Sequence, residues 1–238
     1  MRFPRAGGVL LHPTSLPGRF GIGDLGDDAY HLLDVLAATK QRLWQVLPLG
    51  PTGWGGSPYQ CLSAFAGNPL LISPDRLAAD GLLTPDDLHD VPSFSDDRVD
   101  FGAVIPWKLA LLATATRRFR ERADGGLAVA FDVFCGAQGW WLDDYALFRA
   151  LKDAHGGAVW SDWPAGVARR DPSALQHARA ALVDVVTHHK VEQFVFFRQW
   201  QALRRHAAER GVRIIGDMPI FVAYDSADVW AHPELFFL

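Results

Sequence analysis

An aspartate near the end of the chain, Asp217, is the first residue whose position raises a chemical question. It follows VRIIG at residues 212–216, an apolar, β-branched run that is typical of a buried parallel strand. A carboxylate in this place lies at the rim of a parallel sheet, where it either caps the next turn or belongs to a reaction site. Gly216 and Pro219 are compatible with a turn, so the position alone favours the cap.

A second group of candidate side chains lies in WGGSPYQ, residues 54–60, just after the apolar run LWQVLPLG at residues 43–50. The glycines allow the backbone to approach a ligand closely. The ring of Tyr59 combines an apolar face, which can stack on a sugar, with a hydroxyl that can bond to one. The alternative is that Tyr59 and Trp54 only cover the end of the sheet, and the spacing leaves both roles open.

Two other patterns are poor matches to cofactor sites. Residues 21–26 read GIGDLG, but eight residues separate this glycine pattern from the preceding strand, and its aspartates would repel a pyrophosphate. We therefore expect a structural turn there. The neighbours His188 and His189 could bind a metal, yet adjacent residues on a helix point about 100° apart. We expect neither a metal nor an organic cofactor.

Composition narrows the classes of partner. The net charge is −4 with both signs dispersed, so neither nucleic acid nor a strongly charged substrate is expected. The two cysteines, Cys61 and Cys135, form no zinc spacing or disulfide framework.

The apolar stretch GGVLL is shorter than the roughly seven residues of a signal peptide core. No apolar run reaches the roughly 18 residues of a membrane span. We expect a cytoplasmic protein that binds a neutral ligand.

The elements that must position these residues follow a parallel α/β order. An apolar run at residues 8–12 predicts a first strand, residues 27–41 predict an amphipathic helix, and residues 43–50 predict a second strand. The third strand arrives only at residue 212, far later than a βα crossover requires. An inserted subdomain must therefore separate the second strand from the third.

The intervening sequence carries clear helix signals. Thr84 is a predicted N-cap with Pro85 at the first helical position. Further helices are predicted from Trp107, from residues 140–157, which end on two glycines, and from residues 192–210, which feed the third strand.

We therefore predict an α/β fold: an incomplete (β/α)8 TIM barrel, about the first three strands, with a large inserted helical subdomain. The predicted parts are the first two strands with the candidate site loop, the mainly helical insert, and the barrel helix with the third strand: residues 1–60, 61–190 and 191–238. The final ELFFL has no turn signal, so we expect the natural protein to continue.

The chain resembles amylomaltase, the bacterial 4-α-glucanotransferase, in the motifs GVLLHPTSLPGRFGIGDLG, WQVLPLGPTGWGGSPYQCLSAFAGNPLLI, WWLDDYALF, WSDWP, FFRQW and IIGDMPIFVAYDSADVWAHPELF. The similarity runs in order across essentially the whole chain. It implies a (β/α)8 barrel with inserted helical subdomains. It also implies a retaining reaction that moves α-1,4-glucan segments between maltodextrins.

The resemblance also implies roles for individual residues. Tyr59 would stack on the sugar next to the scissile bond, and Ser57 would hydrogen-bond the substrate. Trp54 matches a position where the family often has tyrosine, on a secondary glucan-binding surface; tryptophan keeps the stacking but lacks the hydroxyl. Asp217 matches an aspartate that supports the active-site arginine and the substrate.

The catalytic carboxylates of the family are not among these motifs. In amylomaltases the nucleophilic aspartate follows the fourth strand, the acid/base glutamate follows the fifth, and a stabilising His-Asp pair follows the seventh. Retaining transfer needs two carboxylates about 5–5.5 Å apart, and Asp217 cannot supply both. The resemblance thus implies that these 238 residues are inactive alone.

Two alternative functions stay open at this point. One is an α-glucan hydrolase on the same barrel, which would release mostly glucose and maltose from maltotriose instead of longer chains. The other is a non-catalytic glucan-binding protein, if the natural chain ends at Leu238.

We expect the 238-residue chain on its own to be poorly soluble or loosely folded, because three parallel strands leave open edges and apolar faces. Thermal unfolding followed by circular dichroism checks this. A sharp, cooperative transition of the monomer would contradict the prediction of three open strands.

Overall fold

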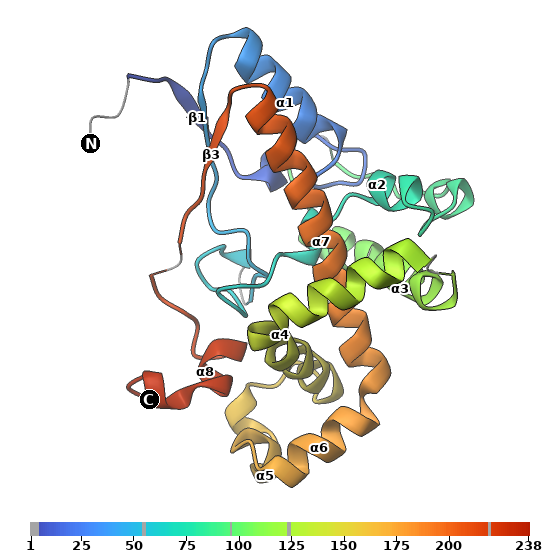
Figure 1. The fold of residues 1–238 in the computed structure, drawn as a ribbon, viewed down its shortest axis with the longest axis vertical. Coiled ribbons are helices and arrows are strands. Elements are labelled where there is room, and N and C mark those ends of the chain that lie inside the picture. The colour runs from blue at the N-terminus through green and yellow to red at the C-terminus, as the bar shows by residue number, and fades with distance from the viewer. Residues whose placement is uncertain (1–4, 54–55, 96, 123–124, 219) are drawn as a thin grey trace. The chain divides into compact units, whose positions relative to one another are not determined.

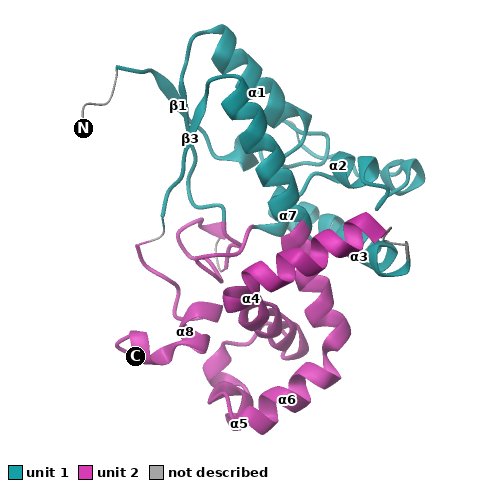
Figure 2. Ribbon diagram, in the orientation of Figure 1, with its two compact units in different colours: residues 1–49, 68–122, 195–218 teal, residues 50–67, 123–194, 219–238 magenta. Residues whose placement is uncertain are grey.

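The computed structural model describes residues 5–53, 56–95, 97–122, 125–218 and 220–238. The chain divides into two compact units (Figure 2). Unit 1 comprises residues 1–49, 68–122 and 195–218, and unit 2 comprises residues 50–67, 123–194 and 219–238. In the described part of the chain, no helix combines the length and apolar character needed to cross a bilayer.

Unit 1 contains a parallel sheet of three short strands (Figure 1). The strands are β1 (Gly8–Leu10), β2 (Leu43–Gln45) and β3 (Arg213–Ile215), in the order β1-β2-β3. Both pairings are parallel, with Val9 opposite Trp44 and Trp44 opposite Ile214. The three predicted strands are therefore confirmed, and their helices fit a partial barrel.

The central strand holds the buried part of this sheet. Trp44 is fully buried, and its indole Nε1 donates a 2.8 Å hydrogen bond to the Leu11 carbonyl just beyond β1. The outer strands are less covered than their apolar sequences predict: Leu10 is 57% exposed and Ile215 is 41% exposed. The prediction of fully buried strands is wrong for these two side chains, because the described residues leave them accessible.

The helices of unit 1 include the predicted ones, but the helix predicted from Trp107 begins at Phe101, and the helix predicted from residue 192 begins at Val183. They are α1 (Asp27–Ala38), α2 (Pro74–Ala79), α3 (Phe101–Arg122) and the C-terminal half of α7 (Val183–Glu209), with 3-10 turns at Pro13–Ser15, Pro69–Leu71 and Pro85–Leu88. α1 buries Ala29, Leu33 and Leu36 along one stripe. The predicted N-cap Thr84 is confirmed, since a capping box joins it to Asp87.

A buried ion pair supports unit 1 between the start of α1 and α3. The Lys108 side chain has no exposed surface, and its ammonium lies 3.1 Å from an Asp24 carboxylate oxygen. Asp24 also accepts a 2.9 Å bond from the Gly26 amide, the N-cap of α1. Burial raises the pKa of Asp24 and lowers the pKa of Lys108, although their mutual attraction opposes both shifts. The aspartate of the GIGDLG segment thus has a structural partner.

Unit 2 is mainly helical. It contains α4 (Gly125–Ala154), α5 (Ala165–Ala168), α6 (Pro172–Ala181), the N-terminal half of α7, α8 (Ala227–Ala231), and 3-10 turns at Trp160–Asp162 and Pro233–Leu235. Its core is aromatic: the ring of Phe148 lies 5.5 Å from that of Trp163 and 5.9 Å from that of Trp230. Gly156 and Gly157, which follow α4, both have positive φ, as the predicted glycine cap requires.

α4 begins well before the predicted start at residue 140. Its first half is rich in glycine, which lowers intrinsic helix propensity. The rings of Phe131 and Phe134 lie 5.6 and 5.8 Å from that of Phe194 on α7. This packing between distant segments supplies stabilisation that local sequence does not show.

Replacing Lys108 with methionine is expected to destabilise α3 by about 3–5 kcal/mol, because it leaves the Asp24 carboxylate buried without its partner. Amide hydrogen exchange of α3 measures the free energy of opening. The double variant Asp24→Asn/Lys108→Met should recover most of this loss. Equal losses in the single and double variants would contradict the role of the ion pair.

Candidate functional site

The C-terminal edge of the sheet in unit 1 carries the predicted aspartate. Leu10, Gln45 and Ile215 are paired across the three strands, so the residues that follow them lie along one edge. Asp217 comes two positions after Ile215 and is half-buried. The structure therefore places this carboxylate at the rim where the sequence predicts it.

His12 lies at the same edge, two residues past β1, and was not among the predicted site residues. Its Nδ1 accepts a 3.3 Å bond from the Thr14 amide, and its Nε2 lies 3.3 Å from the Pro48 carbonyl. This pattern assigns the proton to Nε2, which donates to Pro48. Burial lowers the pKa of His12, so the neutral ring is favoured. The sequence signal that could have identified His12 is its position as a polar residue directly after the apolar run GVLL at residues 8–11.

The loop that carries the predicted sugar-binding residues belongs to unit 2 and is closed by backbone pairing. Thr52 and Cys61 form an antiparallel bridge, the Gly53 amide donates to the Gln60 carbonyl at 2.8 Å, and the Leu62 amide donates to Pro51 at 2.8 Å. This pairing fixes both ends of the segment that contains Ser57 and Tyr59.

The turn of this loop leaves the tyrosine ring accessible. Tyr59 is 51% exposed. The Tyr59 amide donates to the Ser57 hydroxyl oxygen at 3.3 Å, so Ser57 holds the turn while its own proton can still be donated elsewhere. The Cys61 thiol bonds the Pro58 carbonyl at 2.7 Å, and burial raises its pKa to about 11. A thiol that stays protonated is a packing group, not a nucleophile.

Two side chains distant in sequence anchor the segment that follows this loop. Asp228 accepts a 3.0 Å bond from the Ala64 amide. The Gln193 amide accepts from the Gly67 N–H at 2.7 Å and donates to the Gly67 carbonyl at 2.9 Å. These contacts satisfy backbone groups that no strand or helix pairs. Sequence reasoning missed both anchors because neither lies in a local motif.

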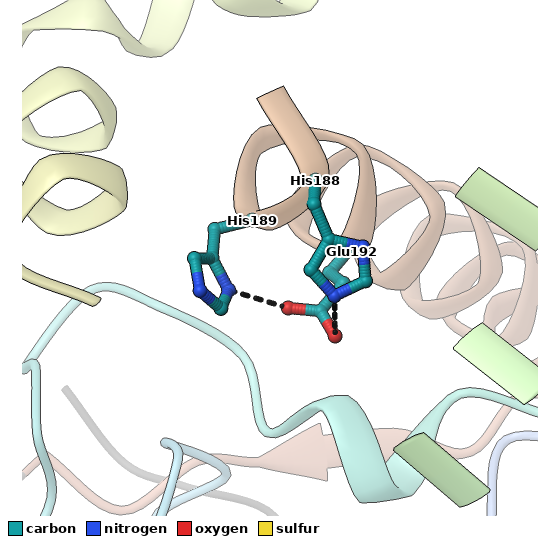
Figure 3. A group of neighbouring side chains, drawn as sticks. All are labelled: His188, His189 and Glu192. Atoms are coloured by element: carbon teal, nitrogen blue, oxygen red, sulfur yellow. Dashed lines mark hydrogen bonds and ion pairs between the residues drawn. The ribbon is translucent and has the colours of Figure 1, made fainter. Parts of the chain in front are cut away.

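A cluster of histidines and carboxylates lies on the N-terminal half of α7 (Figure 3). His189 Nδ1 lies 2.9 Å from Glu192, and His188 Nε2 lies 3.3 Å from the other oxygen of the same carboxylate. His189 Nε2 lies 2.8 Å from Asp153 on α4. The expectation that neighbouring histidines diverge is wrong here, since both rings reach Glu192.

The cluster has the ligand types of a metal site, because the donor atoms of His188, His189 and Glu192 all lie within 4.8 Å of one another. Both nitrogens of His189 are nevertheless engaged with carboxylates, so a metal would have to displace at least one of these hydrogen bonds. The geometry therefore favours an internal ion network.

The contacts within this network shift the pKa values of His189 and Glu192. Burial lowers the pKa of His189, but the hydrogen bonds to Asp153 and Glu192 raise it above its ordinary value. Burial raises the pKa of Glu192, but the bonds from the two histidines hold it well below its usual range. Each ring nitrogen of His189 faces a carboxylate oxygen, and this geometry favours the protonated ring, which can donate from both nitrogens.

A family profile described as 4-alpha-glucanotransferase matches residues 11–238. The chain belongs to the 4-alpha-glucanotransferase family. Relatives include the 4-alpha-glucanotransferases of Thermus thermophilus, 52% identical over 238 residues, and of Synechocystis, 51% identical over 234 residues. These alignments cover 100% and 98% of this chain but 47% and 46% of the relatives. The chain thus spans about half the length of these family members.

Solved structures of amylomaltases share the fold. The Streptococcus agalactiae enzyme in complex with acarbose has a TM-score of 0.94 and 38% identity, covering 99% of this chain and 47% of that one. The Corynebacterium glutamicum amylomaltase has a TM-score of 0.71 at 18% identity, covering 96% of this chain and 32% of that one, which shows a common fold. The predicted resemblance to amylomaltase is therefore confirmed.

The site residues that the family resemblance implies are divided between the two units. Ser57 and Tyr59 belong to unit 2, and Asp217 belongs to unit 1. Trp54 lies outside the described residues. The roles of these residues, and their convergence on one substrate, stay predictions.

In this family member, NMR titration of the His189 ring is expected to give a pKa above 6.5. Glu192→Gln should bring it down, because one charged partner is lost while the burial stays. A raised folded-state pKa means that the stabilisation is fully present below the unfolded value of about 6.5 and is lost as pH rises through the folded value. A His189 pKa that is unchanged in Glu192→Gln would contradict the network.

Proposed function

We propose that this chain forms the sugar-stacking part of a 4-α-glucanotransferase, which transfers α-1,4-glucan segments between maltodextrins by a retaining double displacement. The observation that carries the proposal is the Ser57–Tyr59 turn: an accessible tyrosine ring on a loop that is closed by backbone pairing. Family membership and the likeness to an amylomaltase solved with acarbose support a glucan as the ligand.

Binding begins at the loop of unit 2. The exposed ring of Tyr59 stacks on the apolar face of the sugar beside the scissile bond. Ser57 has its hydroxyl oxygen occupied by the Tyr59 amide, so its proton is the group that bonds a sugar hydroxyl. Trp54 supplies a second stacking surface that helps to hold the acceptor glucan.

Asp217 acts at the rim of the sheet. It supports the active-site arginine and bonds substrate hydroxyls. The nucleophile and the acid/base of the double displacement are two carboxylates about 5–5.5 Å apart. We place both in the part of the relatives' length that this chain does not span. The chain alone is then inactive, and its three strands are the first of a (β/α)8 barrel interrupted by a helical subdomain.

The products depend on which molecule attacks the glycosyl intermediate. Transfer exceeds hydrolysis when an acceptor 4-hydroxyl is held in place and water is kept out. The reaction needs no metal or organic cofactor, and its substrates fit a cytoplasmic enzyme. The finer division into residues 1–60, 61–190 and 191–238 belongs to the same proposal.

In the full-length enzyme, Asp217→Asn is expected to lower kcat roughly hundredfold, the size of effect seen when a reacting group is misplaced. The exposed aspartate variant Asp90→Asn makes the same charge change away from the rim and should retain wild-type turnover. The readout is the ladder of longer maltodextrins formed from maltotriose. If the Asp217→Asn enzyme turned over at close to the wild-type rate, the carboxylate would have no role in catalysis and would only cap the turn.

A further inference from the structure

A groove on unit 1 is not used by the proposed reaction. It lies between α2 and the C-terminal half of α7, both in unit 1 (Figure 2), and has a volume of about 320 Å³. Three arginines line it, Arg76 from α2 and Arg198 and Arg205 from α7, together with a single carboxylate, Asp80. This volume is at the lower end of the range for small-molecule sites, roughly 300–1,000 Å³.

Arg76 is held in place on one wall. Its guanidinium lies over the ring of Tyr30, 4.3 Å from the centroid, and its Nη2 donates to Asp27 at 2.7 Å. The stacking and the ion pair together restrict the side chain, so less conformational entropy is lost when it binds a ligand.

The opposite wall is one stripe of α7. Arg198, Gln201, Ala202 and Arg205 recur at the i, i+3, i+4 and i+7 positions of one helix face. Arg198 is paired with Asp80 at 2.9 Å. Among the described residues, none forms an ion pair or hydrogen bond with the Arg205 side chain, so its charge is uncompensated within the groove.

The lining residue Gln199 is fixed by backbone contacts. Its amide accepts from the Ser73 N–H at 2.7 Å and donates to the Ser73 carbonyl at 3.1 Å, and the side chain is buried. Ser73 is the N-cap of α2, so this clamp joins the two helices that form the groove. The three arginines therefore lie on two helices, α2 and α7, whose spacing is fixed in the absence of a ligand.

We propose that this groove binds a phosphate group, either free or carried by a small phosphorylated sugar. Planar guanidinium groups match phosphate oxygens in paired hydrogen bonds. Arg76 and Arg198 each already have a carboxylate partner, so Arg205 is the arginine of this groove that offers an uncompensated charge. The single carboxylate of the lining is already neutralised by Arg198. With a net charge of −4, the chain as a whole does not favour a polyanion such as nucleic acid.

This inference does not depend on the proposed transfer reaction. None of the groove residues is assigned to the glucan site, and a phosphate ligand has chemistry that a neutral glucan lacks. The groove residues do not include Ser57, Tyr59 or Asp217, so substitutions in the groove test this inference without changing the proposed glucan site.

The test is isothermal titration calorimetry of the full-length enzyme with inorganic phosphate, glucose 6-phosphate and glucose, at constant ionic strength set with chloride. Phosphate and glucose 6-phosphate are expected to bind and glucose is not. Tighter binding of the ester identifies a phosphorylated sugar, and equal binding identifies the free ion. Arg205→Gln should weaken binding roughly tenfold, as expected for the loss of a charged hydrogen bond.

The control is Arg204→Gln, which removes the same charge from the neighbouring position of α7, outside the groove. Its affinity for phosphate should equal that of the wild type. Equal weakening by both variants would mean nonspecific attraction and would overturn the proposal. So would the absence of phosphate binding, or glucose binding as strong as that of its phosphate. Both arginines are exposed, so neither change is expected to disturb folding.

Discussion

Unit 1 depends on the parallel pairing of β2 with a strand on each side. Each strand has only three residues, so the ladder is short, and the burial of Trp44 beneath the Leu11 carbonyl supplements it. Parallel pairing brings the C-terminal ends of all three strands to one edge. His12 follows β1 and Asp217 follows β3, so this register brings both residues to the same rim, with β2 between their strands.

In unit 2, hydrogen bonds and a single β-bridge, not a sheet, constrain the irregular loop that contains Ser57 and Tyr59. Backbone pairing closes the loop around Ser57 and Tyr59, and Asp228 and Gln193 satisfy amides in the segment that follows. The tyrosine ring can therefore be exposed while its backbone is constrained. A residue whose backbone is already constrained loses less freedom on binding, which supports the proposed role of Tyr59 in stacking on a sugar.

Local sequence patterns were sufficient for the elements whose signals are local. The three strands, the stripe of α1, the capping box of Thr84 and the glycine cap after α4 were all predictable, because turn chemistry and periodicity determine them. The early start of α4, the Gln193 and Asp228 anchors and the contacts of His188 and His189 with Glu192 were not. The anchors join residues 126 and 164 positions apart, and the histidine contacts depend on side-chain reach that helix periodicity does not describe.

The two glutamines of α7 that grip backbone, Gln193 on Gly67 and Gln199 on Ser73, have an implication for which substitutions the chain tolerates. A carboxamide offers one donor and one acceptor, as a peptide group does, so each clamp imitates a rung of a sheet. Glutamate has the same shape but, when ionised, would face a carbonyl with a second acceptor. Asparagine keeps the chemistry but is one methylene shorter. We therefore expect substitutions to be tolerated on the exposed face of α7, whereas Gln193 and Gln199 accept almost no other residue.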